Sequence, residues 1–280
     1  MTTTKIFLDS CSPIDTINTI KLLNHLDGQT TNPSLLVKNP KLQSELVGGK
    51  ISESRLLELY KNAIIEISNL IPNGSVSIEV YADKNSTPED LLLQANEFAT
   101  WIPNAHIKFP TTKSGLEAAE IFVNNGGKVN MTLVFSQEQA LAVHLATQNA
   151  KNKGDVFVSP FVGRLDDIGM NGIDLVSNIL DMYKKLDSKV EVLGASLRTI
   201  SHINKCVNLG CDIITAPISA LDLYKNQTNS LSIEESNQNL QPIPYQDFTQ
   251  TTWKDCNIQH DLTDKGLDKF VADWKSVLLD

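Results

Sequence analysis

The 280-residue sequence predicts a single (β/α)8 barrel, the TIM-barrel fold of the α/β class. Eight short apolar runs, rich in Val and Ile with little polar alternation, are typical of parallel strands covered on both faces. Segments with the period of amphipathic helices separate these runs. Short loops that end in helix-capping residues join the strands to the helices. A strand, a short loop and a capped helix, repeated eight times, is the pattern of a closed barrel.

The expected elements can be placed along the chain. A capping hydroxyl precedes a proline at Ser12-Pro13 and at Thr87-Pro88, and Ser114–Glu117 and Ser136–Gln139 have the form of a capping box. The longest helical pattern spans residues 56–71. The expected strands are Lys5–Asp9, a weaker run at Asp27–Thr31, Ser75–Val80, Ala105–Phe109, Lys128–Val134, Asp155–Ser159, Lys189–Ala195 and Cys211–Ala216.

A doubly wound open sheet is the alternative architecture. Such sheets bind nucleotides through a glycine-rich first turn, and Asp9–Pro13 contains no glycine. We therefore expect residues 1–225 to form the barrel. Residues 226–280 would add a polar surface excursion, Asn226–His260, and a final amphipathic helix with Leu267, Phe270 and Trp274 on one stripe, which docks on the barrel.

Composition excludes several classes of function. A net charge of -9 argues against a broad nucleic-acid surface, although two arginines can still hold a phosphate. The four cysteines have neither zinc spacing nor a C-x-x-C pair, so we expect reduced thiols in a cytoplasmic protein and no metal. No apolar run reaches the length of a membrane span, and residues 1–5 lead directly into the first strand, so we expect neither a membrane contact nor a signal peptide. A homo-oligomer is compatible with this composition.

Lys108 is the least expected residue of the chain. It lies within an apolar strand, where a lysine is seldom buried unless it forms an ion pair or takes part in a reaction. Burial disfavours the ammonium form, so the pKa can fall and leave an amine that attacks a carbonyl. An ion pair inside the barrel is the ordinary alternative. Lys5, Lys128 and Lys189, in contrast, open their strands and can reach solvent.

Further polar residues interrupt the apolar runs where the strands end. Chemistry in a barrel of this kind takes place at the carboxyl ends of the strands. An amine nucleophile needs a proton shuttle, which two carboxylates and a threonine can supply. Amide and hydroxyl groups would orient a polyhydroxylated substrate, and two arginines would hold a phosphate. The residues at these ends are Asp9, Thr30, Asn32, Glu79, Lys108, Asn130, Thr132, Ser159, Arg164, Ser196 and Arg198.

Six ordered motifs resemble those of the transaldolase family. They are Phe7–Ser10, Thr30–Leu35, Ile107–Thr111, Asn130–Ser136, Ser159–Arg164 and Gly194–Arg198, and the resemblance covers residues 5–217 and, more loosely, Leu262–Leu278. It implies that Lys108 forms the Schiff base and that Asp9 takes the proton of the C4 hydroxyl. Glu79 and Thr132 would act through a water on the imine. The dihydroxyacetone unit would contact Thr30, Asn32, Asn130 and Ser159, and the phosphate would contact Arg164, Ser196 and Arg198.

The resemblance also implies a reaction. A ketose phosphate, sedoheptulose 7-phosphate or fructose 6-phosphate, is cleaved, and the retained dihydroxyacetone unit adds to an aldose phosphate, as in the non-oxidative pentose phosphate pathway. The protonated imine is the electron sink, so no cofactor is expected. One alternative is a fructose 6-phosphate aldolase, whose relatives tend to carry tyrosine where this chain has Phe161; phenylalanine favours transfer. The other is a non-catalytic sugar-phosphate-binding barrel, which would tolerate loss of Lys108, Asp9 or Glu79, yet all three are present.

Some residues have a second interpretation. Arg164 and Arg198 could be surface residues that bridge loops, and Thr30–Ser34 could be only a turn. His106 lies two residues before Lys108 and should face the same side of the strand. It either packs one layer deeper with hydrogen bonds or, when charged, lowers the pKa of the lysine. We favour the packed position, because the interior of such a barrel is a filled core.

Overall fold

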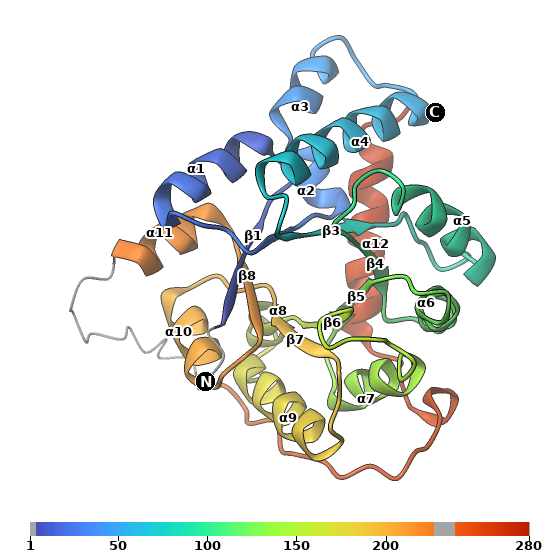
Figure 1. The fold of residues 1–280 in the computed structure, drawn as a ribbon, viewed down its shortest axis with the longest axis vertical. Coiled ribbons are helices and arrows are strands. Elements are labelled where there is room, and N and C mark those ends of the chain that lie inside the picture. Colours follow the sequence, from blue (N-terminus) through green and yellow to red (C-terminus); the bar gives the residue numbers. More distant parts are fainter. Residues whose placement is uncertain (1–3, 227–238, 280) are drawn as a thin grey trace.

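Eight parallel strands pair in chain order, and the last strand closes on the first (Figure 1). The computed structural model describes residues 4–226 and 239–279. The strands are β1 (Lys5–Asp9), β2 (Gly28–Thr30), β3 (Ser75–Glu79), β4 (Ala105–Pro110), β5 (Val129–Val134), β6 (Val156–Pro160), β7 (Glu191–Gly194) and β8 (Ile213–Ala216). All eight expected strands are confirmed. The parallel pairing of β1 with β8, which sets Lys5 opposite Ile213, excludes the open sheet.

Helices surround this barrel and fill the connections between strands. They are α1 (Pro13–Leu23), α2 (Pro33–Val37), α3 (Pro40–Leu46), α4 (Glu53–Leu70), α5 (Pro88–Phe98), α6 (Lys113–Asn124), α7 (Gln137–Ala146), α8 (Val162–Asp166), α9 (Gly172–Lys185), α10 (Ile200–Asn208), α11 (Ile218–Asn226), the 3-10 helix η1 (Trp253–Asp255) and α12 (Asp261–Ser276). None of the helices in the described ranges is long and apolar enough to cross a membrane.

Side-chain capping fixes where several helices begin. The expected caps at Ser12, Thr87 and Ser136 are confirmed. The capping box expected at Ser114 is wrong: the N-cap of α6 is Thr112, whose hydroxyl accepts a hydrogen bond from the Gly115 N–H at 3.1 Å. The extended backbone of Thr112, which follows the end of β4, places its hydroxyl over the first turn.

Strand alternation divides the barrel interior into layers. Residues two apart on a strand face the same side, so Phe157 lies beneath Ser159 and His106 lies beneath Lys108. The rings of Phe157 and His106 stack with centroids 4.1 Å apart in the deeper layer. The packed layer therefore supports a polar layer at the carboxyl ends of the strands.

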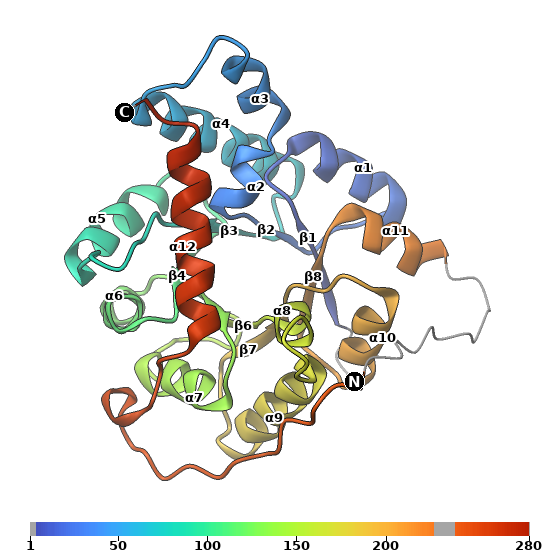
Figure 2. The ribbon, with the colours of Figure 1, turned by 180° about the vertical axis from the view of Figure 1, so that it is seen from behind.

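Helix α12 crosses the carboxyl face of the barrel, as Figure 2 shows from that side. The Thr263 hydroxyl donates a hydrogen bond to the Leu133 carbonyl of β5 at 2.9 Å. Asp273 accepts a hydrogen bond from Ser34, so α12 is also held against α2. Phe270 and Trp274 are buried beneath the helix.

Residues 239–260 run along the outside of the barrel helices. The Gln241 backbone bonds to Gly169 and Asn171, and the Trp253 indole donates to Glu120 at 2.9 Å. The expected polar excursion began at Asn226, which ends α11, and its residues 227–238 lie outside the described ranges. Its described part lies against α9, α7 and α6.

The connection between β4 and α6 allows the packing of a helix start against a strand end to be tested. A Cβ on Gly115 would overlap the carbonyl oxygen of Pro110. Helix propensity alone favours alanine by about 1 kcal/mol, but overpacking against fixed backbone costs about 1–3 kcal/mol. We expect Gly115→Ala to lower the free energy of unfolding in urea. The control is Gly48→Ala, where the nearest atom lies 3.5 Å from the new Cβ. A Gly115→Ala protein as stable as the unmodified one would contradict this packing.

Candidate active site

The carboxyl ends of the strands open into a cavity of about 310 Å³. Ten of the twelve predicted site residues line it, and Glu79 and Asn130 lie directly beside the lining residues Lys108 and Ser159. The ten residues are Asp9, Thr30, Asn32, Lys108, Thr132, Ser159, Phe161, Arg164, Ser196 and Arg198. With Glu79 of β3, the structure thus brings predicted site residues from seven strands, or from the loops that follow them, to one place.

Lys108 is buried in an ion pair at the floor of this cavity. Its Nζ lies 2.9 Å from Oε2 of Glu79, and the two side chains are 4% and 3% exposed. The β3–β4 register sets these residues side by side on neighbouring strands. The amine also donates to the carbonyl of Thr31 at 3.1 Å. Burial raises the pKa of Glu79, although the ammonium of Lys108 opposes this shift, so Glu79 is well suited to accept a proton.

Asp9 ends a chain of hydroxyl groups that begins on β8. The Thr30 Oγ1 lies 2.8 Å from Asp9 Oδ1 and 2.7 Å from Thr215 Oγ1. A hydroxyl has one hydrogen, so Thr30 donates to Asp9 and Thr215 donates to Thr30. Burial raises the pKa of Asp9, while the charge of Lys108 and the hydrogen bond from Thr30 lower it. Asp9 is therefore a carboxylate that can take up a proton inside the cavity.

Asn130 connects two serines beneath the cavity. Its amide donates to Ser77 Oγ at 3.0 Å, and its carbonyl oxygen accepts from Ser159 Oγ at 2.6 Å. The Ser159 hydroxyl is thereby oriented. Thr132 is buried as well, and its hydroxyl has no hydrogen-bond partner among residues 4–226 and 239–279. Because it lines the cavity, this hydroxyl is available to a bound molecule.

Cationic side chains gather at the outer end of the cavity. The Arg164 guanidinium lies over the rings of Phe161 and Phe270, at 5.1 and 5.6 Å from their centroids. Arg198 is half exposed and forms a two-point ion pair with Asp167 at 2.6 and 2.8 Å. This end of the cavity can bind an anion, because guanidinium groups match the geometry of phosphate oxygens.

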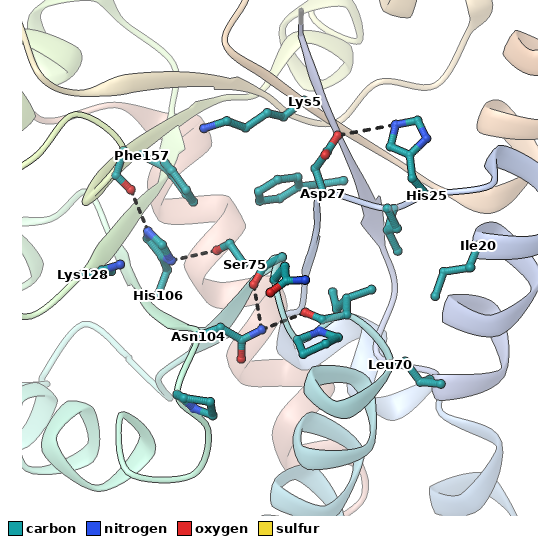
Figure 3. A pocket seen from close by; sticks show the side chains of 18 residues that line it. Lys5, Ile20, His25, Asp27, Leu70, Ser75, Asn104, His106, Lys128 and Phe157 are labelled. Carbon is teal, nitrogen blue, oxygen red and sulfur yellow. Dashed lines mark hydrogen bonds and ion pairs between the residues drawn. The ribbon is translucent and has the colours of Figure 1, made fainter.

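His106 takes the packed position and lies away from Lys108. It lines a larger cavity, of about 610 Å³, at the opposite end of the barrel (Figure 3). Its Nδ1 lies 2.7 Å from Ser75 Oγ and its Nε2 lies 2.9 Å from the Gly154 carbonyl. Burial lowers the pKa of His106 to about 4, so the ring is neutral at pH 7. Both ring nitrogens of His106 are thus bonded to the protein, so this ring is not available to a molecule bound in the cavity.

Sequence reasoning missed several residues of the site. Thr215 interrupts the apolar strand β8, which is the same signal that revealed Lys108. Phe270 was expected to dock on the barrel, but no sequence pattern shows that it reaches the cavity. Lys38 and Ser34 line the mouth from the α2 region. Within the described ranges, no group of three or more His, Cys, Asp or Glu could hold a metal ion.

Comparisons with known proteins agree with this geometry. A family model described as Transaldolase/Fructose-6-phosphate aldolase matches residues 6–280. A protein named "Probable transaldolase" from Cereibacter sphaeroides is 36% identical over 279 residues, which cover 98% of this chain and 99% of the relative. One with the same name from Dehalococcoides mccartyi is 35% identical over 273 residues, covering 98% and 99%. A solved fructose-bisphosphate aldolase from Campylobacter jejuni shares the fold, with a TM-score of 0.50 at 9% identity over 78% of this chain and 72% of that one.

The neutral state of His106 predicts how stability depends on pH. Its pKa is about 4 in the folded protein and about 6.5 in the unfolded chain, so the unfolded state binds the proton more readily between these values. The stabilisation is present above about pH 6.5 and is lost as the pH falls toward 4. By pH 5, about 2 kcal/mol should be lost relative to pH 7.

The variant His106→Gln, neutral at every pH, should lose less stability over this range. Urea unfolding at pH 7 and pH 5 measures the difference, with the exposed His25→Gln as the control. Equal losses in the unmodified protein and in His106→Gln would contradict the buried, neutral state of His106.

Proposed function

The chain belongs to the transaldolase/fructose-6-phosphate aldolase family, and we propose that it transfers a dihydroxyacetone unit between sugar phosphates through an imine on Lys108. The donor is a ketose phosphate, sedoheptulose 7-phosphate or fructose 6-phosphate, in the non-oxidative pentose phosphate pathway of the cytoplasm. The observation that carries this proposal is the amine of Lys108 at the cavity floor, 2.9 Å from the carboxyl group of Glu79.

The first step joins the amine to the substrate. Glu79 takes a proton from the Lys108 ammonium, and the freed amine attacks the C2 carbonyl to give a carbinolamine. Loss of the C2 hydroxyl as water needs a proton donor, and the protonated Glu79 supplies one through a water that the Thr132 hydroxyl can hold. The product is a protonated imine.

The second step breaks the C3–C4 bond. Asp9 takes the proton from the C4 hydroxyl, C4 becomes the aldehyde of the departing aldose phosphate, and the bonding electrons move into the imine to give an enamine. The enamine carbon then attacks the aldehyde of the acceptor, and Asp9 returns its proton to the new hydroxyl. The raised pKa of Asp9 suits both directions, because a group that gives and takes the same proton works best near the operating pH.

The remaining residues orient the substrate. Asn32 and Ser159 line the cavity. The Ser159 hydroxyl donates its hydrogen to the Asn130 side-chain oxygen, so its own oxygen can accept a hydrogen bond from a hydroxyl of the retained three-carbon unit. We assign the phosphate to Arg164, Arg198 and Ser196, which line the cavity together. Phe161, whose ring has no hydroxyl to activate water, favours transfer over release of the three-carbon unit.

Substitution of the lysine tests the imine. We expect Lys108→Met to reduce turnover on the order of 10³-fold or more, because no other amine replaces the nucleophile. Borohydride reduction with fructose 6-phosphate, followed by peptide mass mapping, should show the adduct on Lys108. Lys128→Met, which removes an exposed lysine of the barrel, is the matched control and should keep both activity and adduct. An active Lys108→Met protein would overturn the mechanism.

Product analysis tests transfer against simple cleavage. With fructose 6-phosphate alone, the enzyme should hold the three-carbon unit as the enamine and turn over only when an aldose phosphate acceptor is added. Free dihydroxyacetone is measured by an enzyme-coupled assay. Its continuous release without an acceptor would identify a fructose 6-phosphate aldolase instead.

A further inference from the structure

The loop that carries Arg198 is held by a histidine outside the cavity. His202, in the first turn of α10, places its Nδ1 3.3 Å from the Arg198 backbone N–H. Its Nε2 lies 2.9 Å from Oδ2 of Asp166, at the end of α8. Both side chains are close to buried, at 10% and 11% exposure. His202 therefore connects two elements that each carry one arginine of the anion site.

These contacts fix the proton on the ring. A backbone N–H can only donate, so Nδ1 must accept and the hydrogen of the neutral imidazole lies on Nε2, facing Asp166. Burial alone would raise the pKa of Asp166, but the hydrogen bonds from His202 and from the Gly172 N–H lower it overall. A charged Asp166 in turn keeps the ring oriented with Nδ1 toward the loop.

Two adjacent aspartates, Asp166 and Asp167, hold the loop that carries Arg198 at two points. Asp166 binds His202, which binds the backbone of Arg198, while Asp167 binds the guanidinium of the same arginine. Gly163 permits the close approach of this loop to α8, because a Cβ there would lie 2.5 Å from the backbone oxygen of Ser196. Ser196 adopts a left-handed backbone with φ 57°, which an L-residue keeps only where its surroundings enforce it.

We propose that His202 is a positioning residue for the phosphate group of the substrate, acting through the backbone of Arg198. This inference rests on the proposed function. Without the acceptor at Nδ1, the Ser196–Arg198 loop relaxes from its left-handed conformation, and Arg198 and Ser196 no longer face the cavity together. Lys108 and Asp9 lie on other strands and keep their contacts. The expected defect is thus confined to phosphate-bearing ligands.

Three variants separate positioning from general stability. His202→Phe keeps the ring shape but removes both nitrogen contacts. His202→Asn keeps an oxygen near the position of Nδ1, so it can still accept from the Arg198 N–H. His144→Phe is the matched control, because His144, on α7, bonds to Ser188 in the connection between α9 and β7 and does not line the cavity. Arg198→Ala serves as the reference for loss of the guanidinium.

The measurements are KM and kcat with fructose 6-phosphate plus an acceptor, the dissociation constant of inorganic phosphate by calorimetry, and borohydride trapping with dihydroxyacetone, which has no phosphate. His202→Phe should raise KM and the phosphate dissociation constant roughly tenfold, about 1.4 kcal/mol, as expected for losing a buried hydrogen bond. Trapping of dihydroxyacetone should be unchanged. His202→Asn should stay closer to the unmodified enzyme, and His144→Phe should match it.

Two results would overturn the inference. Unchanged KM and phosphate binding in His202→Phe would show that the loop does not need the histidine. An equal loss of dihydroxyacetone trapping would show a general structural role. Failure of the proposed imine has a different signature, since the unmodified enzyme would then be trapped with neither fructose 6-phosphate nor dihydroxyacetone. The effect of His202→Phe on inorganic phosphate binding would still test the positioning role.

Discussion

The buried ion pair between Lys108 and Glu79 is the constraint around which the barrel interior is arranged. Removing one partner of a buried pair leaves an uncompensated charge and costs about 3–5 kcal/mol, so the pair must be kept together. Parallel register on β3 and β4 does this with two adjacent strands, and the Thr31 carbonyl satisfies another hydrogen of the amine. In the layer beneath, His106 is neutral, and the buried charge of Glu191 is paired with Lys5 at 2.9 Å. The proposed chemistry and the packed core thus occupy successive layers of the same strands.

The outer end of the site depends on the loops and on the terminal helix. Arg164 lies between aromatic rings from α12 and from the end of β6, while Arg198 is held by Asp167. In the proposed mechanism, protons are transferred at the strand ends, where burial raises the pKa of both carboxyl groups, Asp9 and Glu79. The proposed phosphate site, in contrast, lies on segments outside the strand that carries Lys108. This separation is what the family fold permits, since loops after the strands vary while the barrel remains.

The sequence predicts those elements that follow a repeating pattern and those polar residues that interrupt one. The eight strands follow from their apolar runs, and the polar strand ends from the breaks in those runs. Thr215 gives the same signal and was overlooked. The pairing of Asp167 with Arg198 and of Asp166 with His202 joins the end of α8 to the start of α10, more than 30 positions away, and no periodicity reveals it. The start of α6 was misplaced by two residues because Thr112 and Ser114 are both good capping residues, and the end of β4 decides between them.

The most direct test of the central claim is a crystal structure of the enzyme reduced with borohydride in the presence of fructose 6-phosphate. The mechanism predicts a covalent bond from Lys108 Nζ to C2 of the sugar, with Asp9 beside the C4 hydroxyl and the phosphate between Arg164 and Arg198. A sugar bound without this bond, or bound in the cavity beside His106 at the other end of the barrel, would contradict it.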